Sequence, residues 1–406
     1  MLNLAHCFSF SGRRCPDIRW ALHESSNYEI LFAAGSILVA TDADQGSQRF
    51  FTGHDSAICA LDLAKDGSWV ATAQEDNVAY VKVWDFESAR PIGTILYPFT
   101  AISCLSFSHN KKLLCVTGTD SHKREIITIW NIENISLGKK PELVAKQVSE
   151  FNILSCKFSP LEADKLVSCG RENIRFWRIK GDHLAGGAVV LNHHARETVF
   201  TVLEYEFATE NPTTALQNDT SKRVFIGSRE GLLFQVNYYT RELEGVFKIH
   251  DKAICSIAVS AGFCVTGSED QYLRVWPLDF TEYFLEAKHE GIVISLGISQ
   301  DSLRVACGIS SGGLGILDLS SQSYKTIMRS HTQKIFQIIN HHPTGNLITL
   351  SEDLTIRIWD PKKLEQVYEF TYSKEDPCLA ITAHPTESFF AAGFRSGILR
   401  IFDIDK

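Results

Sequence analysis

The hydrophobic positions of this chain follow the two-residue period of β-strands, and no long helical period competes with it. Residues 331–372 show the pattern most clearly, with a Pro-Thr-Gly turn after the first apolar run. The strands predicted within this stretch are 335–338, 346–350, 355–359 and 366–370. The alternation indicates that each strand is half buried, and that the strands come in groups of four.

The third strand of each group ends in a recurring anchor, most often a Trp followed by Asp. The clearest copy is residues 350–360, which read Leu-Ser-Glu-Asp-Leu-Thr-Ile-Arg-Ile-Trp-Asp. The anchors, spaced by 40 to 59 residues, are Trp84, Trp130, Trp177, Val236, Trp276, Leu317, Trp359 and Phe402. A repeat of roughly 40–45 residues with four strands and a Trp-Asp signature is typical of WD-repeat propellers. The sequence therefore predicts an all-β fold, a WD-repeat β-propeller.

The number of repeats predicts how the chain divides into domains. A degenerate unit at residues 18–51 precedes the eight anchored units, which makes nine in all. We expect one seven-bladed propeller over residues 18–330, the first blades of a second propeller over 331–406, and an N-terminal strand or extension over 1–17. The alternative is a single ring of eight or nine blades, in which residues 2–10 return as the missing outer strand and hide the terminal edge.

Composition narrows the classes of partner. The 406 residues are 44% hydrophobic and 22% charged, and no apolar run reaches the eighteen residues of a membrane span. The net charge of −8 argues against a general electrostatic grip on nucleic acid. The eleven cysteines include no C-x-x-C pair and mostly follow the repeat, which indicates buried thiols in a reducing compartment. We therefore predict a cytoplasmic protein without membrane or nucleic-acid partners.

Two repeats contain His, Ser, Asp and Trp, a combination that resembles a catalytic triad. The sets are His250, Ser268, Asp270 and Trp276 in one unit, and His331, Ser351, Asp353 and Trp359 in the other. We interpret both as structural tetrads in which the Asp accepts from the His ring and from turn amides, while the Ser hydroxyl links His to the indole N–H. His54 and His289 are expected to keep the His alone.

Nothing else in the sequence predicts chemistry. The pairs His193-His194 and His341-His342 have no Cys or carboxylate nearby at ligand spacing. We therefore predict no catalytic residue, no metal site and no cofactor.

The loops between second and third strands are the predicted surface for partners, because propellers commonly present this face. Three arginines, Arg171, Arg229 and Arg395, lie in these loops, with Glu269 and Glu352 at the equivalent place in the best-preserved units. Arginines on a rim are suited to dock an acidic tail through bidentate pairs.

Several strings resemble a specific family. Residues 31–40 and 48–54 are similar to the opening of echinoderm microtubule-associated protein-like propellers. Residues 268–280, with the unusual Pro277 after the Trp, resemble the WD repeat-containing protein 90 family, as do residues 285–291. The resemblance implies centriolar and ciliary protein partners, with tubulin or microtubules reached indirectly. It also implies that this chain corresponds to a partial member or a short isoform.

The repeats and the resemblance together predict a non-enzymatic scaffold that supports the centriole microtubule wall, its inner scaffold and cilium assembly. The expected location is the cytoskeleton, at the centriole or centrosome and the basal body of the cilium. The alternative is a WD-repeat adaptor outside the cytoskeleton, such as a ubiquitin-ligase substrate receptor or a chromatin-associated scaffold. A propeller enzyme is a third class, and it lacks the convergent acids or metal ligands that it needs.

Overall fold

The structure, a computed structural model, describes residues 4–12, 14–23, 27–76, 79–191, 196–206 and 222–404. Apart from one short 3-10 helix, η1 (Ile135–Leu137), the regular elements in these ranges are β-strands. No helix among them is long and apolar enough to cross a membrane. The predicted all-β WD-repeat fold class is confirmed, while the predicted His193-His194 loop lies outside the described residues.

Antiparallel sheets follow one another along the chain, and we call them blades 1 to 9. Blade 1 contains β1 (Arg19–Leu22), β2 (Tyr28–Ala34), β3 (Ile37–Asp42) and β4 (Gln48–Phe51). Blade 2 contains β5 (Ile58–Leu63), β6 (Trp69–Gln74), β7 (Ala79–Asp85) and the first part of β8 (Arg90–Phe107). Blade 3 contains the rest of β8, β9 (Leu113–Asp120), β10 (Glu125–Asn131) and β11 (Glu142–Ser149). Because β8 runs through both blades, blades 2 and 3 form one continuous sheet.

The next four blades are separate four-stranded sheets. Blade 4 contains β12 (Ile153–Phe158), β13 (Lys165–Gly170), β14 (Asn173–Lys180) and β15 (His183–Ala188). Blade 5 contains β16 (Phe200–Tyr205), β17 (Arg223–Ser228), β18 (Leu232–Asn237) and β19 (Leu243–Lys248). Blade 6 contains β20 (Ile254–Val259), β21 (Phe263–Ser268), β22 (Tyr272–Pro277) and β23 (Leu285–Lys288). Blade 7 contains β24 (Val293–Ile298), β25 (Arg304–Ile309), β26 (Leu314–Asp318) and β27 (Ser323–Met328).

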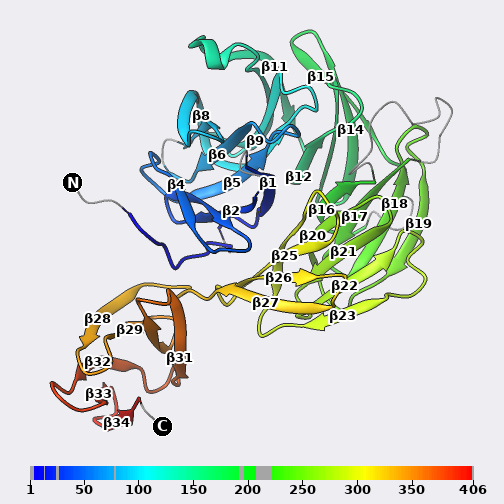
Figure 1. Cartoon of the computed structure of the whole chain (residues 1–406). Coiled ribbons are helices and arrows are strands. Elements are labelled where there is room, and N and C mark those ends of the chain that lie inside the picture. The colour runs from blue at the N-terminus through cyan, green and yellow to red at the C-terminus, as the bar shows by residue number, and fades with distance from the viewer. Residues whose placement is uncertain are drawn as a thin grey trace.

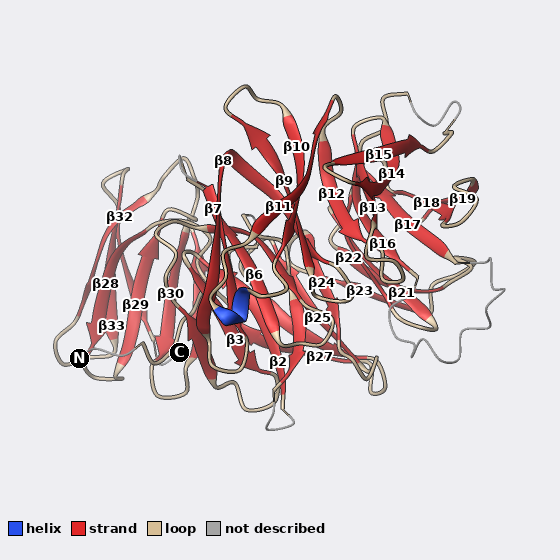
Figure 2. Cartoon of the chain, turned by 90° about the horizontal axis from the view of Figure 1, so that it is seen from above, coloured by secondary structure: helices blue, strands red, loops and turns tan. Residues whose placement is uncertain are grey.

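Two blades remain, and we call them the two-blade unit. Blade 8 contains β28 (Ile335–His341), β29 (Asn346–Ser351), β30 (Thr355–Asp360) and β31 (Glu365–Thr371). Blade 9 contains β32 (Cys378–Ala383), β33 (Phe389–Phe394) and β34 (Leu399–Asp403), so its described part has three strands. In both overall views these strands lie beside the other blades and not among them (Figures 1 and 2).

Blades 1 to 7 form a ring. Their first strands contact one another in chain order, and β24 of blade 7 returns to contact β1 of blade 1. This contact closes the circle after seven blades. The domain bounds 18–330 and 331–406 remain a proposal, which this arrangement supports.

The seam between blades 7 and 1 is held without exchange of a strand. The Trp20 indole Nε1 donates to the Gly297 carbonyl at 2.9 Å, and Arg304 pairs with Asp44 at 3.0 Å. Phe10, in a segment that forms no strand over residues 4–12, is buried in the same core cluster as residues of both blades. The N-terminal segment therefore packs into the seam as an irregular chain, unlike the outer strand considered for residues 2–10.

Candidate functional site

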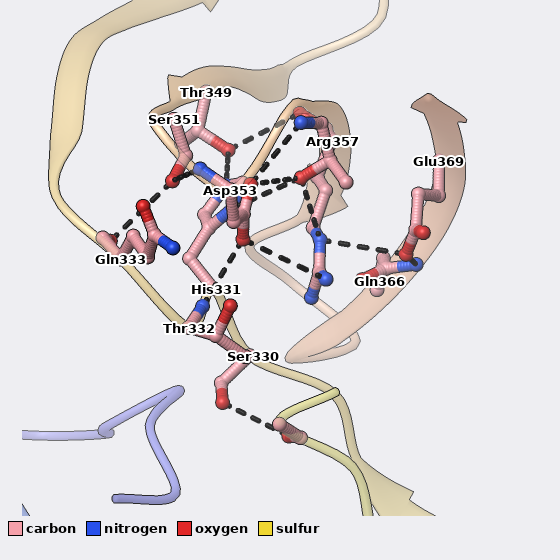
Figure 3. Close-up of polar contacts among 12 residues, drawn as sticks. Ser330, His331, Thr332, Gln333, Thr349, Ser351, Asp353, Arg357, Gln366 and Glu369 are labelled. Atoms are coloured by element: carbon pink, nitrogen blue, oxygen red, sulfur yellow. Dashed lines mark hydrogen bonds and ion pairs between the residues drawn. The ribbon is translucent and has the colours of Figure 1, made fainter. Parts of the chain in front are cut away.

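Blade 8 contains a buried polar network, shown in Figure 3. His331 Nδ1 lies 2.9 Å from Asp353 Oδ2, and His331 Nε2 lies 2.6 Å from Thr349 Oγ1. The Trp359 indole Nε1 donates to the same threonine hydroxyl at 2.8 Å. The chain of contacts therefore runs from Asp through His and Thr to Trp, and it joins the entry to the first strand with the second and third strands.

Blade 6 repeats this network with nearly the same geometry. His250 lies 2.8 Å from Asp270 and 2.8 Å from Thr266, and Trp276 donates to Thr266 at 3.0 Å. The histidine and threonine are buried. Blades 6 and 8 therefore contain the same chain of contacts from Asp through His and Thr to Trp.

The predicted role of Ser268 and Ser351 as the link between His and Trp is wrong, because a threonine two residues earlier makes it in each blade. Ser268 instead accepts from the Asp270 amide at 3.1 Å and donates to the Lys252 carbonyl at 3.3 Å. Ser268 lies four residues from the position opposite Trp276. At about 3.3 Å per residue, that is about 13 Å along the strand.

The prediction that its unit keeps the His alone is wrong for His54. His54 Nε2 lies 2.7 Å from Thr72 Oγ1, to which Trp84 also donates, and His54 Nδ1 lies 3.1 Å from Gln74 Oε1. Gln74 occupies the place of the serine, and its longer side chain reaches the position that Asp fills elsewhere. His289 Nε2 lies 3.8 Å from the sulfur of Cys307, the residue at the threonine position. In blades 2, 6 and 8 the sequence does contain a signal for this link: a threonine two residues before the Ser or Gln at the end of the second strand.

The electrostatics of these networks are those of structural links. Burial alone would raise the pKa of Asp270, but the hydrogen bonds from His250 and backbone amides hold it well below its usual range. The pKa of Asp353 is low for the same reason, with His331 as the partner. Burial lowers the pKa of His54 to about 4, and the hydrogen bond to the Gln74 amide offsets only part of this effect. Both Asp–His pairs are buried inside their blades, with no more than 6% of any of the four side chains exposed.

The central channel of the ring encloses a cavity of about 420 Å³. Its charged groups are paired: Arg19 contacts Asp62 at 3.0 Å, and Lys157 contacts Glu204 at 2.5 Å. Among the described residues, no group of three or more His, Cys, Asp or Glu side chains is placed to hold a metal ion. All eleven cysteines are free thiols.

The five predicted partner-binding residues are exposed, and each follows the second strand of its blade. The backbone N–H groups of Arg229, Glu269, Glu352 and Arg395 donate, at 2.9 to 3.0 Å, to the carbonyl that precedes the first strand of the same blade. Arg171, Arg229 and Glu269 belong to consecutive blades 4, 5 and 6 of the ring. Glu352 and Arg395 belong to the two-blade unit, so the five side chains occupy two separate structures.

Comparison with known proteins identifies the repeats. The family described as Echinoderm microtubule-associated protein first beta-propeller matches residues 47–291, and the WD domain, G-beta repeat, matches residues 322–360. WD repeat-containing protein 90 of Xenopus tropicalis is 35% identical over 424 residues, and that of Homo sapiens is 33% identical over 428. Each alignment includes 100% of this chain, with 22% and 24% of the respective relative. The predicted resemblance is confirmed.

A third relative is Centriole proteome protein 16 of Chlamydomonas reinhardtii, which is 33% identical over 433 residues. The alignment covers 99% of this chain and 20% of that relative. The chain thus spans about a fifth to a quarter of the length of these relatives.

Proposed function

Because the chain belongs to the family of the echinoderm microtubule-associated protein first propeller, we propose that it is a non-enzymatic scaffold of the centriole and cilium. In this role it supports the microtubule wall and inner scaffold of the centriole, and cilium assembly. The observation that carries the proposal is similarity along the whole chain to WD repeat-containing protein 90 and to Centriole proteome protein 16. The expected location is the cytoskeleton at the centriole and basal body.

The mechanism follows from the rigidity of the ring. In blades 5, 6, 8 and 9 a backbone hydrogen bond ties the loop between second and third strands to the residue that precedes the first strand of the same blade. In blade 4 the Glu172 amide donates instead to the Thr198 carbonyl at the entry to blade 5, which couples the loops of these two blades. Several weak contacts from fixed positions act together, because the first contact raises the effective concentration for the next. The scaffold therefore needs no deep pocket.

Arg171 and Arg229 are the residues that we propose to carry binding, since they are exposed on neighbouring blades. Guanidinium groups bind carboxylates bidentately, so an acidic segment of a centriolar protein fits this part of the rim. Tubulin or microtubules would be reached indirectly, through such a partner. Glu269, on the next blade, repels acidic residues, so we expect the acidic segment of the partner to contact blades 4 and 5 and not blade 6.

The test is the localisation and proximity labelling of the tagged chain in ciliated cells. We expect enrichment at centrioles and labelling of centriolar proteins, both reduced by the double variant Arg171→Ala, Arg229→Ala. The matched control is Lys139→Ala, Lys140→Ala, because this exposed pair lies in the turn between third and fourth strands at the opposite end of a blade. Diffuse or nuclear signal, with ligase or histone components labelled instead, would reject the proposal in favour of an adaptor outside the cytoskeleton.

A further inference from the structure

A pocket of about 210 Å³ lies at the end of the ring where the first strands of blades 2 to 5 finish. Its walls are mainly apolar, because Phe107, Phe158 and Tyr205 are buried there and Leu63 and Pro160 are half-buried. Successive strands of these blades are antiparallel, so the end of the first strand lies opposite to the loop between second and third strands. The pocket is therefore separate from the loop arginines proposed above.

Two basic side chains stand at the rim of this pocket. Lys65 and His109 lie in the turns that follow the first strands of blades 2 and 3, and both are exposed. Burial and the charge of Lys65 lower the pKa of His109, so the imidazole is mainly neutral at pH 7 and lies near the ammonium group. Among the described residues no carboxylate forms an ion pair with Lys65, and the adjacent Asp66 pairs with Lys111 at 2.7 Å. The Lys65 ammonium group therefore remains available to a ligand.

The one carboxylate among the described lining residues already has a partner. Glu204 contacts Lys157 at 2.5 Å, and both side chains also line the central cavity of the ring. This neutral pair lies between the cavity and the pocket and adds no net charge to either. The pocket keeps the positive charge of Lys65, in a chain whose net charge is −8. Such a site favours an anionic group over a cationic one.

The apolar surface continues from the pocket towards blade 5. The Tyr238 hydroxyl lies 2.8 Å from Ser159 Oγ, and Ser159 lines the pocket. The Tyr238 ring also contacts that of Tyr239, with centroids 5.2 Å apart. Tyr239 is 46% exposed, and Leu161, in the same turn as Ser159, is 42% exposed. Exposed apolar side chains grouped beside a pocket mark an interaction site.

We propose that the pocket holds an apolar side chain of a partner protein, in a peptide segment whose neighbouring residues are acidic. Size supports this occupant, because small-molecule sites usually measure about 300–1,000 Å³ and this pocket is smaller. One aromatic or aliphatic anchor in a desolvated pocket is a common centre of a protein interface. Charge complementarity supports the acidic neighbours, since Lys65 and His109 can donate to a carboxylate at the rim. The proposal goes beyond the location at the centriole and does not rest on it.

The experiment measures binding of a fluorescein-labelled peptide, Gly-Ser-Asp-Phe-Asp-Ser-Gly, to the full chain by fluorescence anisotropy. We expect a dissociation constant of about 100 μM or below. Replacing the Phe by Ala, or both Asp by Lys, should weaken binding at least about tenfold. Lys65→Glu in the chain should also weaken it about tenfold, because an attraction becomes a repulsion. Lys374→Glu is the matched charge change at an exposed lysine of the two-blade unit, and it should leave binding unchanged.

The double variant Arg171→Ala, Arg229→Ala separates this pocket from the loop arginines. Binding that is lost in the double variant and kept in Lys65→Glu would place the peptide at the other end of the ring and overturn the proposal. An absence of binding up to about 300 μM chain, or equal binding of the lysine peptide, would overturn it as well. Unchanged circular dichroism of each variant ensures that lost binding is not lost folding. A failure here leaves the proposed function intact, because that function is tested by localisation in ciliated cells.

Discussion

The ring and the two-blade unit place equivalent residues in opposite environments. Ile257 of blade 6 lies opposite Thr266, and Ile338 of blade 8 lies opposite Thr349, the same position of the same repeat. Ile257 is 3% exposed, and Ile338 is 61% exposed. The residues do not differ, and neither do the hydrogen-bond networks beside them. Burial in a repeat protein is therefore a property of the neighbouring blade as much as of the residue itself.

The N-terminal segment provides part of the missing neighbour. Within the ring, Trp84 contacts Phe51 from the outer strand of the preceding blade, with ring centroids 5.9 Å apart. In blade 8 the equivalent Trp359 is contacted by Phe8 of the N-terminal segment, with ring centroids 5.0 Å apart. The same short segment is anchored to the ring, because the Phe10 amide donates to Ser330 Oγ. The segment thus connects the seam of the ring with the open side of blade 8.

The largest expected difference between the two regions comes from truncating the equivalent isoleucines. Ile257→Ala should lower the free energy of unfolding by about 2–4 kcal/mol, because it opens a cavity between blades 5 and 6. Ile338→Ala should change it by less than about 0.5 kcal/mol, since an exposed side chain leaves no cavity. Urea unfolding followed by tryptophan fluorescence measures both. Equal losses would show that blade 8 is covered in solution.

The threonine of the network gives the next largest effect. Thr266→Val keeps the size of the side chain but leaves the His250 and Trp276 nitrogens without their shared partner. We expect a loss of about 1–3 kcal/mol in unfolding free energy. Ser268→Ala should cost about 1 kcal/mol, because Ser268 bonds only to backbone groups of its turn. A larger effect of the serine variant would contradict the assignment of the link.

The blades, the polar network and the exposure of Ile338 differ in how far the sequence alone predicts them. The two-residue period and the Trp spacing are local, so they were enough to predict four-stranded blades. The recurring His, Ser, Asp and Trp favour Ser268 as the link, but its hydroxyl bonds to backbone groups of the turn. Only the pairing of strands reveals that Thr266 stands nearer the indole. The exposure of Ile338 cannot be predicted from the local sequence at all, because it depends on which blades surround this residue in space.

The acid response of the networks should separate blade 2 from blade 6. The pKa of His54 is lowered to about 4, so the unfolded chain, whose histidine titrates near 6.5, binds more protons between these values. Stability contributed by neutral His54 is therefore lost as pH falls from about 6.5 towards 4, by roughly 1–2 kcal/mol between pH 7 and pH 5. Urea unfolding at the two pH values measures the loss.

A variant of the partner provides the control for this response. Gln74→Glu keeps the length of the side chain and gives His54 a carboxylate like the one that His250 has in Asp270, and a nearby negative charge raises the pKa of a histidine. The variant should lose less stability than the wild type over the same pH interval. An identical loss in both proteins would assign the acid response to other histidines.

The smallest expected effect lies between the two regions, at Phe8. Phe8→Ala removes the aromatic contact with Trp359, which is worth about 0.5–1.5 kcal/mol beyond the buried area. The loss should appear in the unfolding of the two-blade unit and not in that of the ring, because the seam is held by Phe10 and Trp20. Hydrogen exchange resolves the two regions, with faster exchange expected in β30 and unchanged exchange in β1. Phe8→Leu, which keeps an apolar side chain there, should restore part of the protection. Faster exchange in β1 as well would mean that the N-terminal segment couples the unfolding of the ring to that of the two-blade unit. The two regions would then differ less in stability than their exposed surfaces indicate.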